Sequence, residues 1–201
     1  MTTPTLEGPR VRLEPLSLAH LPALEQIAFN PRIWRYFNTP IHTAQDLRTW
    51  AKAALALEAA GTGMPWVTIL KSPASGEPDK VAGSTRYIDL DRHHRTVEIG
   101  NTWITPDLHG ANVNPEVKLL QLTYAFETLN LRRVALKTHH ENLQSQAAMR
   151  KLGAQYEGTF RNHYLMDNGS QRHSVWFSIT QEDWPQVRET LNRRLESSIP
   201  R

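Results

Sequence analysis

The pattern of apolar and polar positions is clearest in the middle of the chain. Residues 96–104 read Thr-Val-Glu-Ile-Gly-Asn-Thr-Trp-Ile, and this run predicts a strand. A loop over 105–113 leads to apolar positions spaced three or four residues apart, which predict a helix over 114–129. Asn114 suits the N-cap position of that helix, and Pro115 suits its first helical position. This strand, loop and helix form the central unit of the predicted fold, and the other elements precede or follow it along the chain.

The remaining elements follow from the same two periodicities. Strands are expected where apolar and polar positions alternate, and the first is expected at a sheet edge because Pro15 ends it. Helices are expected after the capping residues Ser17, Thr43 and Thr180. The predicted strands are 10–16, 66–70, 81–90, 133–138, 156–165 and 173–179, and the other predicted helices are 17–29, 43–60, 143–152 and 182–195.

These elements predict one α/β domain over residues 1–201 with a mixed sheet. The helix that connects strands 96–104 and 133–138 acts as a crossover, which requires the two strands to be parallel. Two pairs of strands joined by short polar turns predict antiparallel hairpins, the second with Asn168-Gly169 at its tip. No internal repeat is visible, so the chain is not expected to be a repeat protein.

Composition narrows the class of protein. Hydrophobic residues make up 39% and charged residues 21% of the 201 positions, which is typical of a globular protein. The net charge is +3 with a pI of about 9.3 and no run of Lys and Arg, so a nucleic-acid partner is not expected. The absence of cysteine excludes disulfides, thiolate zinc sites and a cysteine nucleophile. Since no secretory leader or long apolar run is present, we expect a cytoplasmic protein without a membrane partner.

The loop before the central helix has the features of an anion site. A strand that passes through a glycine into a helix leaves several backbone N–H groups unpaired, and these groups attract phosphate. Gly110 is the only glycine in this loop, so neither the dinucleotide fingerprint nor the phosphate loop of nucleotide triphosphatases is present. An ordinary strand-to-helix connection is the alternative interpretation.

Several short motifs occur together over nearly the whole chain. They are the run Gly8 to Leu16, Tyr124-Ala125-Phe126, Asn142-Leu143-Gln144-Ser145, Lys151-Leu152-Gly153-Ala154, Glu157-Gly158 and Glu182-Asp183-Trp184. In this combination the chain resembles the GNAT superfamily of acyl-CoA-dependent N-acetyltransferases, in the branch of ribosomal-protein N-terminal acetyltransferases of the RimJ/RimL kind. The resemblance implies a GNAT-like, strongly twisted and splayed sheet of about six to seven strands flanked by helices.

The resemblance also implies acetyl-CoA as cosubstrate and no metal. His109-Gly110-Ala111-Asn112 stands at the family's pyrophosphate loop, which Val113 and Asn114 continue into the helix. Asp107 occupies the position of a basic or amide residue in the family, and its charge repels phosphate.

The pantetheine arm of coenzyme A is expected beside the end of the central strand. Ile104 and Thr105 match positions whose backbone pairs with this arm in the family. Asn142 matches an asparagine that contacts the arm, and Ser145 lies in the same motif. Two parallel strands that diverge leave unpaired groups, which an extended ligand can fill as another strand would.

Acetyl transfer to an amine requires a base, donors for an oxyanion and a route for the thiolate to leave. The resemblance implies that Glu98 is the base, because many relatives carry a catalytic carboxylate on the corresponding strand. An ion pair with Arg86 or Arg95 is the alternative interpretation. Backbone N–H groups over 103–105 are the candidate oxyanion donors. An α-amino group has a pKa of about 7.7–8.0 against about 10.4 for lysine, so an α-amine needs only a weak base.

The acid is the less determined role. Many relatives carry a tyrosine where this chain has Met149, which has no proton to donate. Ser145 matches the serine proposed as acid in the RimL-like branch, although a hydroxyl in a first helical turn is the alternative interpretation. Tyr164 is a further candidate acid.

Other aromatic and histidine residues have open interpretations. Trp34, Tyr36 and Phe37 are expected in the core or along the acceptor cleft. Three residues of the last hairpin either recognise an acidic acceptor or are simply solvated: Arg161, His163 and His173. The pairs His93-His94 and His139-His140 predict no metal site, because neighbours on a strand point to opposite faces.

The sequence thus predicts an acetyl-CoA-dependent N-acyltransferase acting on a primary amine, which is a peptide or protein N-terminus or a small amino compound. The alternative is a non-catalytic acyl-CoA-binding or regulatory domain on the same fold, indicated by Asp107, Asn112 and Met149. A third hypothesis, nucleic-acid binding, rests on the pI alone. A homodimer is expected only by family resemblance.

Overall fold

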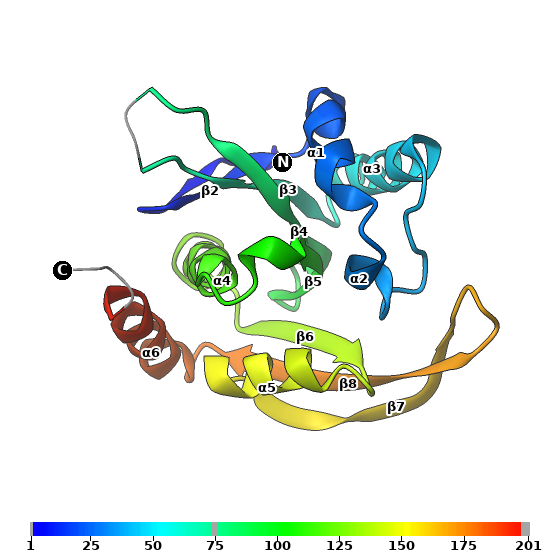
Figure 1. The fold of residues 1–201 in the computed structure, drawn as a ribbon. Coiled ribbons are helices and arrows are strands. Elements are labelled where there is room, and N and C mark those ends of the chain that lie inside the picture. The colour runs from blue at the N-terminus through cyan, green and yellow to red at the C-terminus, as the bar shows by residue number, and fades with distance from the viewer. Residues whose placement is uncertain (1, 74–75, 198–201) are drawn as a thin grey trace.

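Residues 2–73 and 76–197 are described by a computed structural model, in which eight strands form one open, twisted sheet (Figure 1). The strand order is β1-β2-β3-β4-β5-β6-β8-β7. The strands are β1 (Leu6–Glu7), β2 (Val11–Pro15), β3 (Met64–Leu70), β4 (Lys80–Asp91), β5 (Thr96–Ile104), β6 (Arg133–His139), β7 (Gln155–Leu165) and β8 (Gln171–Thr180).

Helices cover both faces of the sheet. α4 and α6 pack against each other, and their apolar residues join one core cluster with those of β5 and β6. α1 and α3 pack together on a second cluster, which contains Val67 and Trp103. The helices are η1 (Leu18–His20), α1 (Leu21–Ala28), α2 (Pro31–Trp34), α3 (Ala44–Ala59), η2 (Pro106–Leu108), α4 (Val113–Thr123), the π-helical turn η3 (Tyr124–Thr128), α5 (Leu143–Leu152) and α6 (Trp184–Glu196).

The predicted elements are largely confirmed. β5 has the predicted bounds and pairs with β6 in parallel, while β3–β4 and β7–β8 pair antiparallel. Thr43 caps α3, as expected, because its hydroxyl accepts the Asp46 N–H at 3.1 Å. Gly153 ends α5 at a φ of 99°, where a residue with a side chain would be strained.

Some boundaries and positions differ from the predictions. The sheet has eight strands rather than six to seven, because the short β1 pairs with β2 and removes β2 from the edge. The last helix begins after Asp183 rather than after Thr180, whose hydroxyl instead lies 3.0 Å from the Asp183 carboxylate. The tail beyond residue 197 lies outside the described residues.

The central helix also begins earlier than predicted. Asn112 is the N-cap of α4, in the left-handed conformation at a φ of 57°, and its side chain caps no helical N–H. Asn114 therefore lies inside the helix, where its Oδ1 atom is buried without a partner among the described residues. Local propensity favoured Asn114 as the N-cap. Asn112 was not predicted because tertiary contacts set its left-handed turn, and residue spacing does not reveal such contacts.

None of the helices over residues 2–73 and 76–197 has the length and apolar character needed to cross a membrane.

Candidate active site

The central feature of the site is the divergence of β5 from β6. The two strands pair only between Thr96–Ile99 and Arg133–Leu136. Beyond these pairs β5 continues to Ile104, and β6 bends away with β8 and β7, as Figure 1 shows. An extended ligand arm can hydrogen-bond to strand edges that lack a neighbouring strand.

The loop after β5 provides free backbone donors at the same end of the divergence. The N–H groups of Gly110, Asn112, Val113 and Asn114 have no acceptor within the part of the chain that the structure describes. They lie at the N-terminus of α4, where the helix dipole favours negative charge. This arrangement suits a diphosphate, as predicted from the sequence.

Two left-handed residues shape this loop. Gly110 has a φ of 87°, and Asn112 follows at 57°. Contacts from both ends of the chain hold Asn112, because its Oδ1 accepts from Arg194 Nε at 3.2 Å and its carbonyl accepts from Arg10 Nη2 at 3.5 Å. The asparagine at the family's second glycine position therefore keeps the turn that a glycine would adopt.

Some backbone groups expected to meet pantetheine already have partners. The Ile104 carbonyl lies 3.2 Å from His109 Nε2, and the Thr105 N–H donates to the Ala82 carbonyl at 2.8 Å. The Thr105 N–H is thus not a free oxyanion donor. The His109 side chain contacts the backbone of β5, and the motif did not indicate this contact.

A β-bulge lies in the diverging part of β5. Ser84 pairs with Trp103 and Arg86 pairs with Gly100, so Thr85 opposes two residues of β5. One of the two, Asn101, has a φ of 48°. Bulges redirect side chains and backbone groups near active sites, and this one lies just beyond the last β5–β6 pair, Ile99 with Leu136.

Glu98, the predicted base, is buried at the start of the divergence. Its side chain is 5% exposed, and its Oε2 lies 2.6 Å from the ammonium of Lys137 on β6. The alternative prediction, an ion pair of Glu98 with Arg86 or Arg95, is therefore wrong. The parallel register places Ala135 opposite Glu98, and Lys137 lies two residues further along β6 on the same face. Burial raises the pKa of Glu98 above 4.5, and the attraction of Lys137 only partly offsets this.

Gly100 leaves room for the Glu98 carboxylate. A Cβ at position 100 would lie 2.8 Å from Glu98 Oε1 and 2.6 Å from Ile88 Cδ1. The oxygen that does not bind Lys137 thus lies over the glycine, at the point where β5 and β6 separate.

Aromatic side chains surround Lys137. Its ammonium lies 4.8 Å from the ring centre of Trp176 and 5.6 Å from that of Tyr164. Burial lowers the pKa of Lys137, but Glu98 outweighs this effect and the value ends above 10.5, so the residue stays charged. The structure therefore brings two predicted catalytic residues, Glu98 and Tyr164, to one cluster with Lys137 between them.

Ser145 lies in the first turn of α5. Its backbone N–H donates to Asn142 Oδ1 at 3.1 Å, so Asn142 is the N-cap of this helix. Within residues 2–73 and 76–197 the Ser145 hydroxyl has no hydrogen-bond partner and does not contact Glu98. Met149 packs against the core. The structure supports the helix-start interpretation of both Asn142 and Ser145, and their predicted contacts with coenzyme A remain predictions.

The aromatic segment before α3 divides between the two expected roles. Trp34 is 3% exposed and donates from Nε1 to the Ala28 carbonyl, so it belongs to the core. Phe37 packs on the same cluster. The Tyr36 ring lies 5.4 Å from His139 at the end of β6, so Tyr36 is the member that reaches the diverging strands.

The last hairpin contributes one buried cation that the sequence did not single out. Arg172 on β8 donates to the Tyr36 carbonyl at 3.2 Å and to Asn38 Oδ1 at 3.0 Å, which ties the hairpin to the segment after α2. Arg161 is exposed, and His173 Nδ1 accepts the Asn162 N–H at 2.8 Å. His163 stacks on Tyr164 at 4.0 Å, and burial lowers its pKa below 6.5, so its ring is neutral at pH 7.

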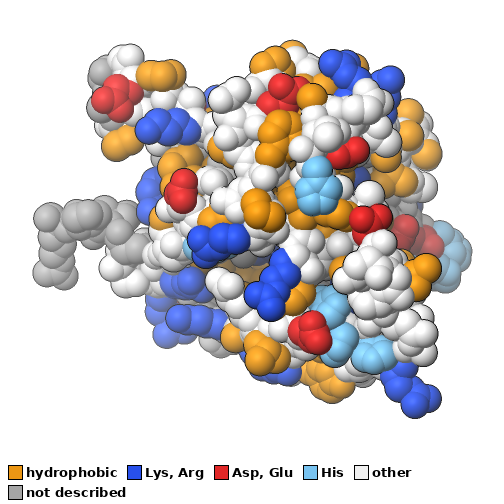
Figure 2. All heavy atoms as spheres, turned by 45° about the vertical axis from the view of Figure 1, so that its right-hand side comes forward, with side chains coloured by type: hydrophobic (Ala, Val, Ile, Leu, Met, Phe, Trp, Pro, Cys, Tyr) orange, Lys and Arg blue, Asp and Glu red, His pale blue; other side chains and the backbone are white. Residues whose placement is uncertain are grey.

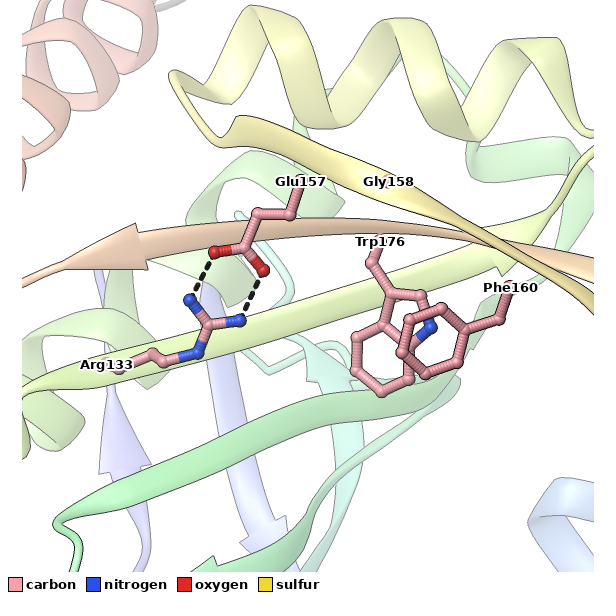
Figure 3. Close-up of a pocket in the computed structure, with 5 residues that line it drawn as sticks. All are labelled: Arg133, Glu157, Gly158, Phe160 and Trp176. Carbon is pink, nitrogen blue, oxygen red and sulfur yellow. Dashed lines mark hydrogen bonds and ion pairs between the residues drawn. The ribbon is translucent and has the colours of Figure 1, made fainter.

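A small pocket of about 210 Å³ adjoins this cluster (Figure 3). Its charged walls, Arg133 and Glu157, form a bidentate ion pair, so neither is free for a ligand. The Trp176 and Phe160 rings lie 5.3 Å apart on its other side. Across residues 2–73 and 76–197, no group of three or more His, Cys, Asp or Glu is placed to hold a metal ion.

Lys137 and Asn101 are site features that sequence reasoning missed, and Arg86 was considered only as a possible partner of Glu98. Only Lys137 could have been found from the sequence, because it is a charged residue at an inward-facing position of a central strand. The bulge at Asn101 depends on the β4 register, and the burial of Arg86 depends on α3, so neither could be read from local sequence.

The fold and the site together define the class. A parallel pair that diverges beside a buried carboxylate, and a loop of free amides that opens a helix, fit proteins that bind a long diphosphate-bearing acyl thioester. Coenzyme A fits the residues present, since the amides of Gly110, Asn112, Val113 and Asn114 are free to bind its diphosphate.

The chain belongs to the family described as acetyltransferase (GNAT) domain, whose model matches residues 10–155. It is 33% identical over 104 residues to "Putative ribosomal N-acetyltransferase YdaF" of Bacillus subtilis (strain 168), covering 52% of this chain and 56% of that relative. The alignment thus spans little more than half the length of that relative. The family match confirms the expected relation to the GNAT acetyltransferases.

Two further similarities cover more of the chain. FsC-acetyl coenzyme A-N(2)-transacetylase of Aspergillus fumigatus is 27% identical over 191 residues, covering 90% of this chain and 78% of that protein. A crystal structure of an acetyltransferase from T. thermophilus is 33% identical with a TM-score of 0.84, covering 97% of this chain and 99% of that one. The splayed sheet expected from the resemblance is therefore confirmed over nearly the whole chain.

Proposed function

We propose that this protein transfers an acetyl group from acetyl-CoA to a primary amine. The observation that carries the proposal is the buried Glu98 carboxylate at the point where β5 leaves β6, beside a loop with free amides. The acceptor is an amine on a peptide or protein N-terminus, or on a small amino compound. YdaF supports the first by its name, and the fungal transacetylase supports the second.

The residues of this chain have separate tasks in the proposed reaction. When bound, acetyl-CoA supplies an activated acetyl thioester. Glu98 Oε1 accepts the proton of the amine, while Lys137 binds Oε2 and keeps the carboxylate oriented. The raised pKa of Glu98 brings its basicity closer to that of an α-amine, which eases this transfer.

Tyr164 is the proposed acid, supported by its place beside Lys137. Ser145 is the second candidate, because its hydroxyl has no recorded partner and matches the motif of the branch. Tyr164→Phe and Ser145→Ala separate the two, because each removes one hydroxyl and little volume. We expect the larger loss of kcat from Tyr164→Phe.

The proposal is tested by binding and by thiol release. Acetyl-CoA at 100 times its Kd should raise the free energy of unfolding by about 2.7 kcal/mol, which is a rise of about 5–10 °C in the melting temperature for a chain of this size. Coenzyme A thiol should appear when peptides or small amines are added. Absence of both signals would refute the proposal, whereas binding without thiol release would favour the non-catalytic acyl-CoA-binding alternative.

A further inference from the structure

Arg86 on β4 is a buried cation without an acidic partner among residues 2–73 and 76–197. It is 5% exposed, and its Nε and Nη2 atoms have no hydrogen-bond partner within the part of the chain that the structure describes. Burial lowers the pKa of Arg86 to about 10, so the guanidinium remains charged at neutral pH. Its one recorded contact is with the Trp50 ring, whose centre lies 4.8 Å from Cζ. An unpaired buried charge is costly and calls for a ligand.

The neighbours of Arg86 add further donors. Trp50 and Trp103 have ring centres 6.1 Å apart, and each has a buried Nε1 without a partner among the described residues. Guanidinium and indole N–H groups only donate hydrogen bonds. The cluster of Arg86, Trp50 and Trp103 therefore lacks an acceptor, and a carboxylate supplies two oxygens that Arg binds in bidentate fashion.

The position of Arg86 relates it to the amine that reacts. Arg86 is paired with Gly100 across β4 and β5, and Glu98 lies two residues before Gly100 on the same face. Diagonal neighbours in a sheet are about 7–8 Å apart. Gly100 has no side chain of its own, and Ile88 Cδ1 and Glu98 Oε1 lie over it. No ion pair joins Arg86 to Glu98, whose partner is Lys137.

The diphosphate loop lies farther away. Residue 104, where β5 ends, is four residues beyond Gly100, which is about 13 Å along a strand. Arg86 is thus too far from the loop after β5 to share the diphosphate of coenzyme A. Figure 2 shows Lys, Arg and His side chains around the centre and lower half of one face, with some Asp and Glu side chains among them.

The geometry points to an acceptor that carries a carboxylate a few bonds from its reacting amine, with Arg86 as the residue that binds this carboxylate. The inference rests on the proposed acetyl transfer and names its substrate class. The carboxylate belongs either to a free amino acid or to an acidic first residue of a peptide. Trp50 is the partly exposed member of the cluster.

The test compares carboxylates with matching carboxamides in the full chain. One arm uses L-alanine and L-alaninamide, and the other uses the peptide amides Asp-Ala-NH2 and Asn-Ala-NH2. The ratio of kcat/KM within each pair is compared between wild type and Arg86→Met, so that differences in amine reactivity cancel. The arm that responds identifies the source of the carboxylate.

We expect Arg86→Met to lower the carboxylate-to-carboxamide ratio by about tenfold or more, mainly through KM. Arg86→Lys should retain an intermediate ratio, because it keeps the charge without the bidentate fork. Arg48→Met, at an exposed position of α3, is the matched control and should leave the ratio unchanged.

A ratio that is equal in wild type and in folded Arg86→Met, in both arms, would overturn the inference while acetyl transfer stands. Melting temperatures with the same four compounds provide a readout without turnover. If no amine releases thiol, a stabilisation by the carboxylates that disappears in Arg86→Met still supports the inference, and its absence in wild type refutes it. If Arg86→Met does not fold, the carboxylate-to-carboxamide ratios of wild type and of Arg86→Lys decide whether the inference stands.

Discussion

Glu98 and Lys118 are both buried ionisable side chains, but their charges are stabilised differently. Glu98 has an opposite charge at 2.6 Å. Lys118 is 7% exposed and donates only to neutral groups, Thr102 Oγ1 at 3.0 Å and Gln121 Oε1 at 3.1 Å. Burial therefore lowers the pKa of Lys118 to about 7, from an ordinary value of 10.5. Burial thus makes the Glu98 carboxylate more basic, whereas the burial of the Lys118 ammonium lowers the stability of the folded protein.

Glu98→Gln should lower kcat/KM by about 10²–10³-fold, because the amide keeps the shape but accepts no proton. In wild type kcat/KM should fall as the pH drops through the raised pKa of Glu98, which lies above 4.5. That acid limb should be absent from the variant, as measured by thiol release between pH 4.5 and 8. Glu189→Gln, on the exposed face of α6, is the control. A variant with the wild-type rate would remove Glu98 from the mechanism.

Lys118→Met should stabilise the protein, and more so at low pH. Below pH 7 the folded state must bury the ammonium, while between pH 7 and 10.5 it releases a proton that the unfolded chain retains. Wild-type stability therefore rises with pH in this window, and the gain from Lys118→Met shrinks. We expect a larger rise in melting temperature at pH 6.5 than at pH 9.5. The exposed Lys52→Met should show neither effect, and an equal gain at both values would contradict the assigned pKa.

The loop between β5 and α4 carries opposing electrostatic effects at the scale of the element. Its free amides and the helix dipole attract a diphosphate, whereas the exposed carboxylate of Asp107 in η2 repels it. The turn does not depend on the missing second glycine, because Asn112 adopts the left-handed conformation with two arginines bound to it. The departure from the family pattern thus affects charge more than backbone geometry.

Asp107→Asn should bind coenzyme A about two- to fivefold more tightly at low salt, and the gain should vanish near 0.5 M salt, where exposed charges are screened within about 4–5 Å. Calorimetric titration at two salt concentrations measures this. Asp167→Asn in the distant β7–β8 turn is the charge-matched control and should change nothing. If both variants behave alike, the local repulsion at Asp107 is not the cause.

At the scale of the molecule, a single carboxylate ties the N-terminal strand to the central helix. Glu116 on α4 is 2% exposed, and its Oε1 accepts the backbone N–H groups of Arg10 at 2.8 Å and Val11 at 2.9 Å. Gly8 allows this approach, because a Cβ there would lie 2.6 Å from the same oxygen. β2 is thereby held against the N-terminal half of α4, the helix that follows the diphosphate loop.

Glu116→Ala should lower the free energy of unfolding by about 2–4 kcal/mol, because it leaves two backbone N–H groups without an acceptor. For a chain of this size the melting temperature should fall by about 5–12 °C. Glu116→Gln, which keeps one acceptor oxygen, should lose less. The exposed Glu189→Ala serves as control, and equal losses in all three variants would show that the buried contacts do not matter.

Local pattern was sufficient for the elements and insufficient for their partners. β5 and α5 have the predicted bounds because strand alternation and helix capping depend on neighbouring residues. The edge position predicted for β2 was wrong because β1 is too short to have a periodic signal. Ser145 and Asn142 were located correctly at a helix start, yet their roles toward a ligand stay predictions.

The sequence by itself determined the order of strands and helices along the chain and the acetyltransferase family, and it indicated Glu98 as the candidate base. Only the tertiary structure decided that Lys137 pairs with Glu98, that Asn112 makes the left-handed turn and that Arg86 is buried without a partner. The physical reason is the difference in sequence distance over which these interactions act. Periodicity and capping act within a few residues, whereas ion pairs and burial depend on the register of strands that are distant in the chain.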